Sequence, residues 1–435
     1  MKNKVTMTKT DKYLLWGMVA GLSLMLILRD VNGISINKFI YFGFAVALMA
    51  IASYRTVVYM VCFMLPLVCG LPGTYIMPCA LVLLAFKRGK VNVMQVVPIL
   101  LILLLELVAA LWYPSMAFAD IINYVSFAAI MVFLVQDDRE VDYRQCVKLY
   151  LLGTLLLCGV ILWVTFADAP KQWLQLFADG FFRVGDIRQE GGGMKLTLEA
   201  NGLAYYSLVG IFCSFLLMEE IEARKKIWFL ILALFFVVVG FLTVSRSWML
   251  VCSVCLLLYI FSKMRNFKHF FAALIVVGMS VALAMYIFSK NPELLAGFET
   301  RFTDDTVESG GSRTYILKKY MEVFFSNIRF VFLGTGVTQG NVVAGMTGSM
   351  HNGTQQILVC CGLVGFVLYM VVLIGATLKA GLGKKISLVY RLPLISVVVF
   401  TQTIQFLNPT MLMLPFIIGI YALKVGRHAD KQQHV

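Results

Sequence analysis

Charged side chains are scarce in this sequence of 435 residues. Asp, Glu, Lys and Arg together make up 14% of it, whereas 60% of the residues are hydrophobic. A water-soluble domain of this length needs far more charge to cover its surface. The apolar residues also form long uninterrupted runs instead of amphipathic stripes, which indicates that lipid surrounds most of the chain. An ordinary soluble domain is therefore excluded.

Patterns that bind metals or form disulfides are also missing. No second histidine or nearby carboxylate accompanies His351 at the spacing of a zinc site. All cysteines except Cys146 lie inside apolar runs, where disulfides are not expected. Cys252 and Cys255 form a CxxC pair without a histidine or carboxylate beside it, so packing is their expected role. We expect no metal, no cofactor and no disulfide.

A basic soluble region is absent as well, although the formal net charge is +14. The lysines and arginines gather at the ends of the apolar runs, where they direct membrane insertion. Without a basic domain outside the membrane, the chain has no surface for nucleic acid. We therefore expect no nucleic-acid partner.

The apolar runs themselves predict membrane-spanning helices. Lipid cannot satisfy backbone N–H and C=O groups, so the runs must form helices or a closed barrel. Barrel strands would be about ten residues long and alternating, whereas these runs are longer and apolar on all sides. We predict an all-α polytopic membrane protein, one integral membrane domain over residues 1–435. Its approximately fourteen spans are Tyr13–Leu28, Phe39–Ala52, Val57–Gly70, Tyr75–Phe86, Val91–Trp112, Met116–Val135, Leu149–Ala167, Leu203–Met218, Ile227–Val244, Trp248–Phe261, Phe270–Phe288, Gln355–Leu378, Leu392–Ile404 and Met411–Leu423.

The fourth span is the least regular, because Pro72 and Pro78 flank or interrupt it. It is either a full span or one arm of a re-entrant hairpin with the third; both leave the later orientations unchanged. The first span follows four lysines and has no small-residue cleavage site after Leu28, so we interpret it as an uncleaved anchor.

Basic residues at the ends of the spans predict the orientation of the chain. One alternating set of loops, which includes both termini, carries nearly all of them, and cytoplasmic loops are the ones enriched in Lys and Arg. We therefore predict an even number of spans and two cytoplasmic termini. The basic residues of this set are Arg55, Lys87, Arg88, Lys90, Arg139, Arg144, Lys148, Arg224, Lys225, Lys226, Lys263, Arg265, Lys268, Lys379, Lys384, Lys385 and Arg391.

Two long outward segments break the pattern of minimal loops. They cover residues 168–201 and 290–352, and loops of such length are usually functional or disordered. In the second, Ser312 can cap a helix whose apolar face carries Ile316, Tyr320 and Phe324 together with Leu317 and Met321. We predict that this amphipathic helix lies flat on the outer face of the membrane.

Arg246 stands at a junction almost too short to be a loop, between two outward span ends. An arginine there must face the helix bundle or a wet cavity, because lipid does not solvate a guanidinium group. We interpret it as part of an anion-binding site. The alternative is an interfacial anchor that snorkels beside Trp248.

His351 is the histidine on the outer side, immediately before Asn352 and a membrane span. The helix dipole and nearby arginines disfavour imidazolium, so a neutral imidazole could accept a proton. The alternative is a histidine with a structural role at the interface.

Glu106 lies deep within a span and Asp120 near an outer span end. Either carboxylate could be functional or could pair with a buried arginine, and we leave both unassigned.

Several short motifs lie in and around the two outward segments. They are Gly311–Tyr315, Phe332–Gly336, His351–Asn352, Gln355–Leu358 and Gly362–Gly365, with Thr243–Ser247 and Glu199–Ala204 earlier in the chain. This arrangement resembles the signature region of the bacterial O-antigen polymerase and O-antigen ligase superfamily. The resemblance covers roughly residues 183–369 and departs from the family at Glu199–Ala200, where Asn-Pro is frequent.

The resemblance implies a glycosyltransferase with a GT-C-like fold in the bacterial cytoplasmic membrane, whose active site faces outward. Such enzymes join saccharides linked to polyprenyl pyrophosphate, by inversion and without a metal. Arg246 and Arg313 match the arginines that hold the pyrophosphate, Arg183 or Arg188 being a third. His351 matches the base, and Asn352 would orient it or the acceptor. Asn201, at the end of the first segment, is a further substrate-orienting candidate.

Polymerase and ligase differ in the acceptor, which is another lipid-linked repeat unit or a lipid A core. Two arginine-bearing segments suit two pyrophosphate-linked lipids, so we favour the polymerase, with the ligase as the alternative. Its partners would be a lipid-linked donor and acceptor, membrane lipids and, as a further candidate, a chain-length regulator. A polysaccharide flippase is the second alternative, but we find no internal repeat and little charge at mid-membrane depth.

Overall fold

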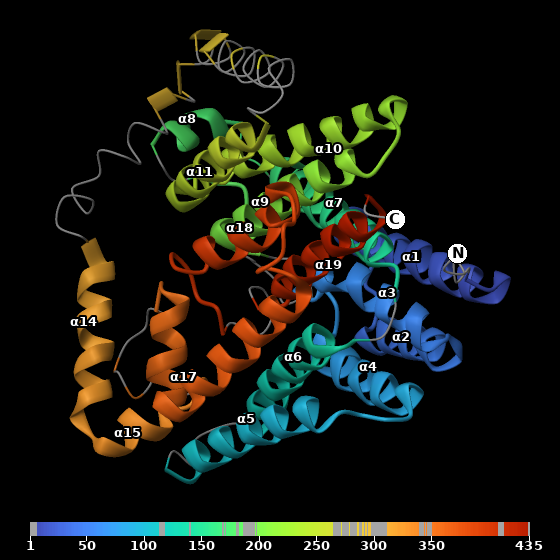
Figure 1. Cartoon of the computed structure of the whole chain (residues 1–435). Coiled ribbons are helices and arrows are strands. Elements are labelled where there is room, and N and C mark those ends of the chain that lie inside the picture. The colour runs from blue at the N-terminus through green and yellow to red at the C-terminus, as the bar shows by residue number, and fades with distance from the viewer. Residues whose placement is uncertain are drawn as a thin grey trace.

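The computed structural model describes residues 7–112, 118–138, 141–167, 171–179, 182–185, 198–263, 311–338, 350–407 and 413–433, with isolated residues between these ranges. Every regular element within them is a helix (Figure 1). The predicted all-helical architecture is therefore confirmed for the described part of the chain. The predicted span Phe270–Phe288 lies mostly outside it.

The helices follow the apolar runs of the sequence, with the polar residues at their ends. Their bounds are α1 Lys9–Asp30, α2 Lys38–Ile51, α3 Tyr54–Met64, η1 Leu65–Leu67, α4 Gly73–Arg88, α5 Val93–Trp112, α6 Phe118–Gln136, α7 Tyr143–Ala167, α8 Trp173–Ala178, α9 Ala200–Glu219, α10 Ala223–Leu242, α11 Arg246–Lys263, α14 Gly311–Ser326, α15 Ile328–Leu333, α17 Gly353–Ala380, η2 Leu388–Tyr390, α18 Leu392–Phe400 and α19 Pro415–Gln433.

Seven of the described helices are long and apolar enough to cross a membrane. They are α1, α5, α6, α7, α9, α10 and α17, while residues 38–51, 54–67 and 246–262 form shorter apolar helices. This set fits a polytopic membrane protein. Fourteen spans and a GT-C-like arrangement remain predictions.

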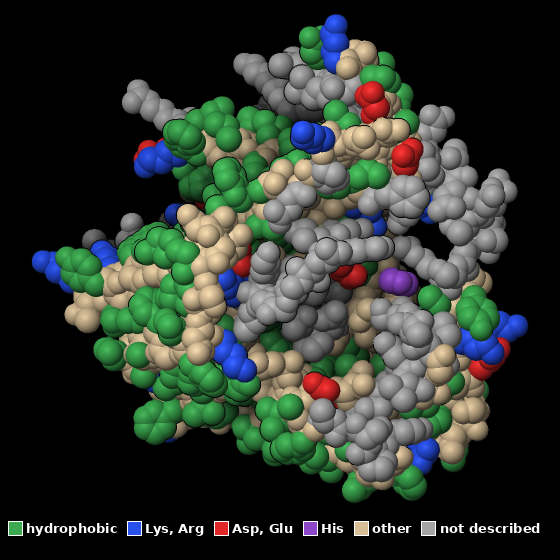
Figure 2. Space-filling model, turned by 180° about the vertical axis from the view of Figure 1, so that it is seen from behind, with side chains coloured by type: hydrophobic (Ala, Val, Ile, Leu, Met, Phe, Trp, Pro, Cys, Tyr) green, Lys and Arg blue, Asp and Glu red, His purple; other side chains and the backbone are tan. Residues whose placement is uncertain are grey.

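The helices divide into an inner and an outer group. Every side chain of α3 from Thr56 to Met64 is buried, and α9 is buried on nearly all sides, as expected of helices that are apolar all round. By contrast, α5 and α10 expose large side chains such as Leu104, Leu111 and Trp228. Figure 2 shows the wide apolar surface of one face, with the basic side chains scattered between apolar areas. We assign these exposed apolar faces to lipid.

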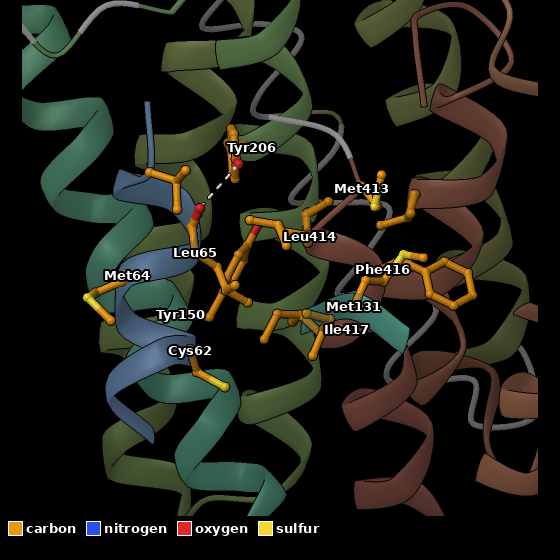
Figure 3. Close-up of a cluster of buried hydrophobic side chains, with 14 of the residues drawn as sticks. Cys62, Met64, Leu65, Met131, Tyr150, Tyr206, Met413, Leu414, Phe416 and Ile417 are labelled. Carbon is orange, nitrogen blue, oxygen red and sulfur yellow. Dashed lines mark hydrogen bonds between the residues drawn. The ribbon is translucent and has the colours of Figure 1, made fainter. Parts of the chain in front are cut away.

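The centre of the inner group is a close-packed cluster from distant parts of the chain (Figure 3). Leu65 of η1 lies beside Tyr150 of α7 and Tyr206 of α9, with Ile417 of α19 across from them. The Tyr206 hydroxyl donates to the Leu65 carbonyl at 3.4 Å, which provides a buried partner where η1 interrupts the α-helical ladder.

A buried ion-pair network joins the ends of three helices on the predicted cytoplasmic side. The Arg88 guanidinium of α4 lies 2.9 Å from the Asp137 carboxylate and 2.8 Å from that of Asp138, just after α6. It also donates to Gln95 of α5 at 2.8 Å. A buried guanidinium needs partners of this kind. The network thereby joins the ends of α4, α5 and α6.

Near the C-terminus, two helices differ in their bounds from the predicted spans. In the predicted span Leu392–Ile404 the helix ends at Phe400, and the chain turns at Thr401, whose carbonyl accepts the Gly353 N–H at 2.7 Å. In the predicted span Met411–Leu423 the helix begins at Pro415 and continues to Gln433. In the polar half of this helix, Lys424 donates to the Asp137 carbonyl at 2.7 Å.

Candidate functional site

Arg183, from the first outward segment, is fixed to the turn between α10 and α11. Its Nε donates to the Thr243 carbonyl at 2.9 Å, and the next residue, Val184, donates its N–H to the Leu242 carbonyl at 3.1 Å. These carbonyls belong to the last residue of α10 and to its C-cap, Thr243, where the helix leaves carbonyls without a helical partner. The first segment therefore caps the turn that leads to Arg246.

The turn itself is strained and tightly bound. Val244 has φ +49°, a conformation that is costly for a β-branched residue and is retained where the surroundings enforce it. The Ser245 hydroxyl accepts the Trp248 N–H at 3.4 Å and so begins α11, which places half-buried Arg246 in its first turn. Strain of this kind often marks functional sites.

Asn201 joins the same cluster from the first turn of α9. The Ser245 hydroxyl donates to Asn201 Oδ1 at 3.0 Å. Three predicted residues from separate parts of the sequence, Arg183, Asn201 and Arg246, are thus held around residues 243–246, a group that we call the arginine cluster.

Trp248, the neighbour of Arg246 in the alternative interpretation, is buried inside the protein. It is 2% exposed, and its indole occupies the space where a side chain on Gly240 would stand. It also meets Phe241 edge to face at 5.4 Å. Trp248 therefore packs the turn from inside, and both interpretations of Arg246 stay predictions.

His351 and Asn352 lie at the start of α17, as the sequence predicts. Asn352 Oδ1 accepts the Gln355 N–H at 2.9 Å, so this side chain caps the helix. His351 directly precedes the cap and is half-buried. The cap uses one lone pair of the Asn352 amide oxygen, so its second lone pair and the amide nitrogen remain for the predicted orienting role.

The segment after α18 secures the start of α17. The Thr401 carbonyl accepts the Gly353 N–H, Thr354 donates to Gln402 at 2.8 Å, and the Leu407 N–H donates to Gln356 at 2.8 Å. A Cβ on Gly353 would also meet the Thr401 carbonyl oxygen at 2.8 Å. The backbone that carries His351 is therefore placed by residues 401–407.

The predicted amphipathic helix is confirmed as α14, but its apolar face does not rest on a membrane surface. Ile316, Tyr320 and Phe324 are buried in the protein core, while Leu317 is exposed. Burial raises the pKa of Tyr320 to about 12. On the outer side, Lys319 pairs with Glu322 at 3.0 Å, which raises the pKa of the lysine. Most of this face is thus covered by the protein itself, with Leu317 as the exposed exception.

Helix α14 brings Arg313 towards the start of α17. Gln355 Nε2 donates to the Leu317 carbonyl at 3.2 Å, and the two helices pack against each other (Figure 1). Arg313 stands in the first turn of α14, one turn before Leu317. Its side chain and the whole of Arg188 lie outside the described residues.

A short chain of contacts links the arginine cluster to His351. Tyr205, one turn after Asn201 on α9, stacks on Phe400 at 5.3 Å between ring centroids. Phe400 ends α18 and directly precedes the Thr401 carbonyl that holds Gly353. The two parts of the candidate site are therefore connected through α9 and α18. Convergence of His351 with Arg246 and Arg313 stays a prediction.

The sequence did not predict a close backbone contact between two glycine-containing segments, Gly334–Gly336 and Val359–Gly362. We call this contact the glycine clasp. Helix α17 breaks at Gly362, with φ +64° and ψ −174°. The freed carbonyls of Val359 and Cys360 accept the N–H groups of Thr335 at 3.1 Å and Gly336 at 2.9 Å. The glycine motifs were visible in the sequence, but their spacing did not show that they pair.

Glu106, left unassigned by the sequence, is 2% exposed and accepts the Val337 N–H at 2.9 Å through Oε1. Asp120 stands exposed in the first turn of α6. A cavity of about 270 Å³ lies elsewhere, lined by residues including Lys38, Thr74 and Tyr75, and contains none of the predicted site residues. Within the described residues no three His, Cys, Asp or Glu side chains gather as metal ligands.

A comparison with known protein families matches the part of the chain that contains the second half of the candidate site. Residues 228–370 match the family model described as O-antigen ligase. The match contains Arg246, Arg313, His351, Asn352 and the glycine clasp, whereas Arg183 and Asn201 precede it. No curated protein and no solved structure matches the chain.

Proposed function

We propose, from the match of residues 228–370 to the O-antigen ligase family model, that this chain polymerises polyprenyl-pyrophosphate-linked oligosaccharide repeat units. The reaction would take place on the outer face of a bacterial cytoplasmic membrane, with both termini in the cytoplasm. The observation that carries the proposal is the arginine cluster: the Arg183–Thr243 and Ser245–Asn201 hydrogen bonds bind the first outward segment to the turn that bears Arg246.

The proposed reaction is a displacement at the anomeric carbon of the donor. A hydroxyl oxygen of the acceptor sugar forms the new C–O bond, and the bond to pyrophosphate breaks with its electron pair on the leaving oxygen. Arg246 and Arg313, with Arg183 or Arg188, neutralise that charge, because guanidinium groups hold phosphate oxygens by charge-assisted hydrogen bonds. The acceptor proton passes to the His351 imidazole. Attack opposite the leaving group inverts the anomeric centre, and this arrangement needs no metal.

The acceptor separates two candidate functions. Two outward segments with arginines suit two pyrophosphate-linked lipids at one site, which favours the polymerase. The description of the matching family favours the ligase, in which the acceptor is lipid A core or another molecule. For the polymerase we further propose a chain-length regulator as partner.

A single reconstitution distinguishes these functions. Purified protein in lipid nanodiscs receives lipid-pyrophosphate repeat units, and the glycans are resolved on a gel. The polymerase gives a ladder of increasing length from the donor alone. A ligase gives product only after lipid A core is added, and a flippase leaves the glycan mass unchanged. Absence of any ladder with active donor would overturn the polymerase proposal.

Arg183→Ala is expected to lower the rate of polymerisation by about 10–100-fold, because it loosens the turn that positions Arg246 and removes a cation. Arg183→Lys keeps the charge without the fixed Nε contact and should recover only part of the rate. Arg329→Ala is the matched control: Arg329 also belongs to an outward segment, but its guanidinium lies over the Trp112 ring at 4.2 Å. Equal losses in the alanine variants of Arg183 and Arg329 would contradict the assignment.

A further inference from the structure

The carboxylate of Glu106 holds a backbone amide of the signature segment from inside the membrane-spanning bundle. Glu106 lies in α5, 231 positions before Val337, whose N–H it accepts. Its side chain is buried, and Oε2 has no hydrogen-bond partner in the described part of the chain. A buried carboxylate is costly within a membrane span, so its retention calls for a role that this contact supplies.

The accepted amide directly follows the glycine clasp. A side chain on Gly334 would collide with the Cys360 carbonyl, and one on Gly362 with the Phe332 carbonyl, so the two backbones meet without side chains between them. Helix α5 also packs against α17, where Leu105 lies 3.1 Å from the position that a Cβ on Gly365 would take. Glu106 therefore binds the end of the clasp to a third helix.

The clasp connects this contact to the first half of α17. Glu106 holds Val337, the neighbour of Gly336, and the Gly336 N–H donates to the Cys360 carbonyl of α17. The Asn352 cap and the Gly353–Thr401 hydrogen bond fix the beginning of the same half, directly after His351. Glu106 therefore supplies one of the contacts that place the first half of α17.

We infer that Glu106 is a positioning residue, which acts as a hydrogen-bond acceptor for the Val337 amide and thereby, through the clasp, helps to place the first half of α17 and His351 before it. This role requires no proton transfer by Glu106 in the reaction. The kinetic consequence rests on the proposed glycosyltransferase function, whereas the structural consequence does not.

Three substitutions separate acceptor geometry from charge. Glu106→Gln keeps an acceptor oxygen at the same reach and removes the charge, so kcat should stay within about threefold of wild type and the pH profile should not change. Glu106→Asp keeps the charge but withdraws it by one methylene, and Glu106→Leu removes the acceptor. Both should lower kcat by about 10–100-fold with a smaller change in KM.

Gln95→Leu is the matched control for a lost buried polar contact on the same helix. Gln95 lies at the other end of α5 from Glu106. It accepts a hydrogen bond from Arg88 and donates one to the Phe133 carbonyl of α6. It should leave kcat unchanged while lowering the thermal stability as Glu106→Leu does. A loss of kcat in Gln95→Leu equal to that in Glu106→Leu would assign the effect to helix packing and overturn the inference.

Hydrogen–deuterium exchange provides the test that is independent of activity. In nanodiscs, the peptide that contains Val337 should be protected in wild type and Glu106→Gln and should exchange at least about tenfold faster in Glu106→Asp. Unchanged protection in Glu106→Asp overturns the inference even if the protein polymerises. Equal loss of kcat in Glu106→Gln and Glu106→Asp also overturns it, because charge would then be what matters. A wild type that is protected but makes no glycan defeats only the proposed function.

Discussion

His351→Ala is expected to lower polymerisation by about 10²–10⁴-fold while the protein inserts and folds normally. This range is the usual contribution of a positioned general base, and the backbone at this position is held by contacts that do not involve the imidazole: the Asn352 cap and the Gly353–Thr401 hydrogen bond. The initial rate with lipid-linked repeat units measures the effect, and size-exclusion chromatography verifies the fold.

His428→Ala is the control for removing an imidazole elsewhere. His428 lies on α19 and stacks on Tyr143 at 5.9 Å between ring centroids, on the predicted cytoplasmic side. Its removal should leave the rate of polymerisation unchanged. A His351→Ala variant that polymerises at the wild-type rate would remove the base from the proposed mechanism and return His351 to the structural interpretation.

Gly362→Ala is expected to produce the largest loss of stability. The left-handed φ of +64° alone costs an alanine about 1–3 kcal/mol. In addition, the new Cβ would collide with the Phe332 carbonyl, which the clasp holds in place. The clasp must open to admit the methyl group, so polymerisation should be lost together with thermal stability.

Gly375→Ala on the same helix is the matched control. A Cβ there meets nothing within 4 Å, and alanine favours a helix interior over glycine by about 0.5–1 kcal/mol. Thermal unfolding in detergent should therefore show a lower midpoint for Gly362→Ala and an equal or higher one for Gly375→Ala. Equal midpoints would mean that the break in α17 is not a structural requirement.

Patterns local in sequence predicted much of this molecule. Apolar runs predicted the long helices, and the pair His351–Asn352 before an apolar run predicted the start of α17, because the cap and the helix are neighbours in the chain. The periodicity after Ser312 predicted α14. These elements depend on residues within a few turns of one another.

Such local patterns could not predict contacts between segments that are distant in the sequence. Glu106 and Val337 are 231 positions apart, and nothing in Leu103–Leu107 indicates which backbone amide the carboxylate will meet. The buried face of α14 was assigned to the membrane for the same reason, since an apolar stripe does not distinguish a lipid surface from a protein surface. The sequence likewise did not show that the Trp248 ring packs against Gly240 inside the protein.

The break in α17 also bears on the depth of His351 in the membrane. Straight, its 28 residues would measure about 42 Å, well beyond a hydrocarbon layer of about 30 Å. Residues 363–380 alone give about 27 Å, and the nine residues before Gly362 turn off at an angle (Figure 1). We expect the bend to keep His351 near the boundary between lipid tails and water, instead of lifting it into bulk solvent. A phosphate group attached to a lipid tail is confined to that same level.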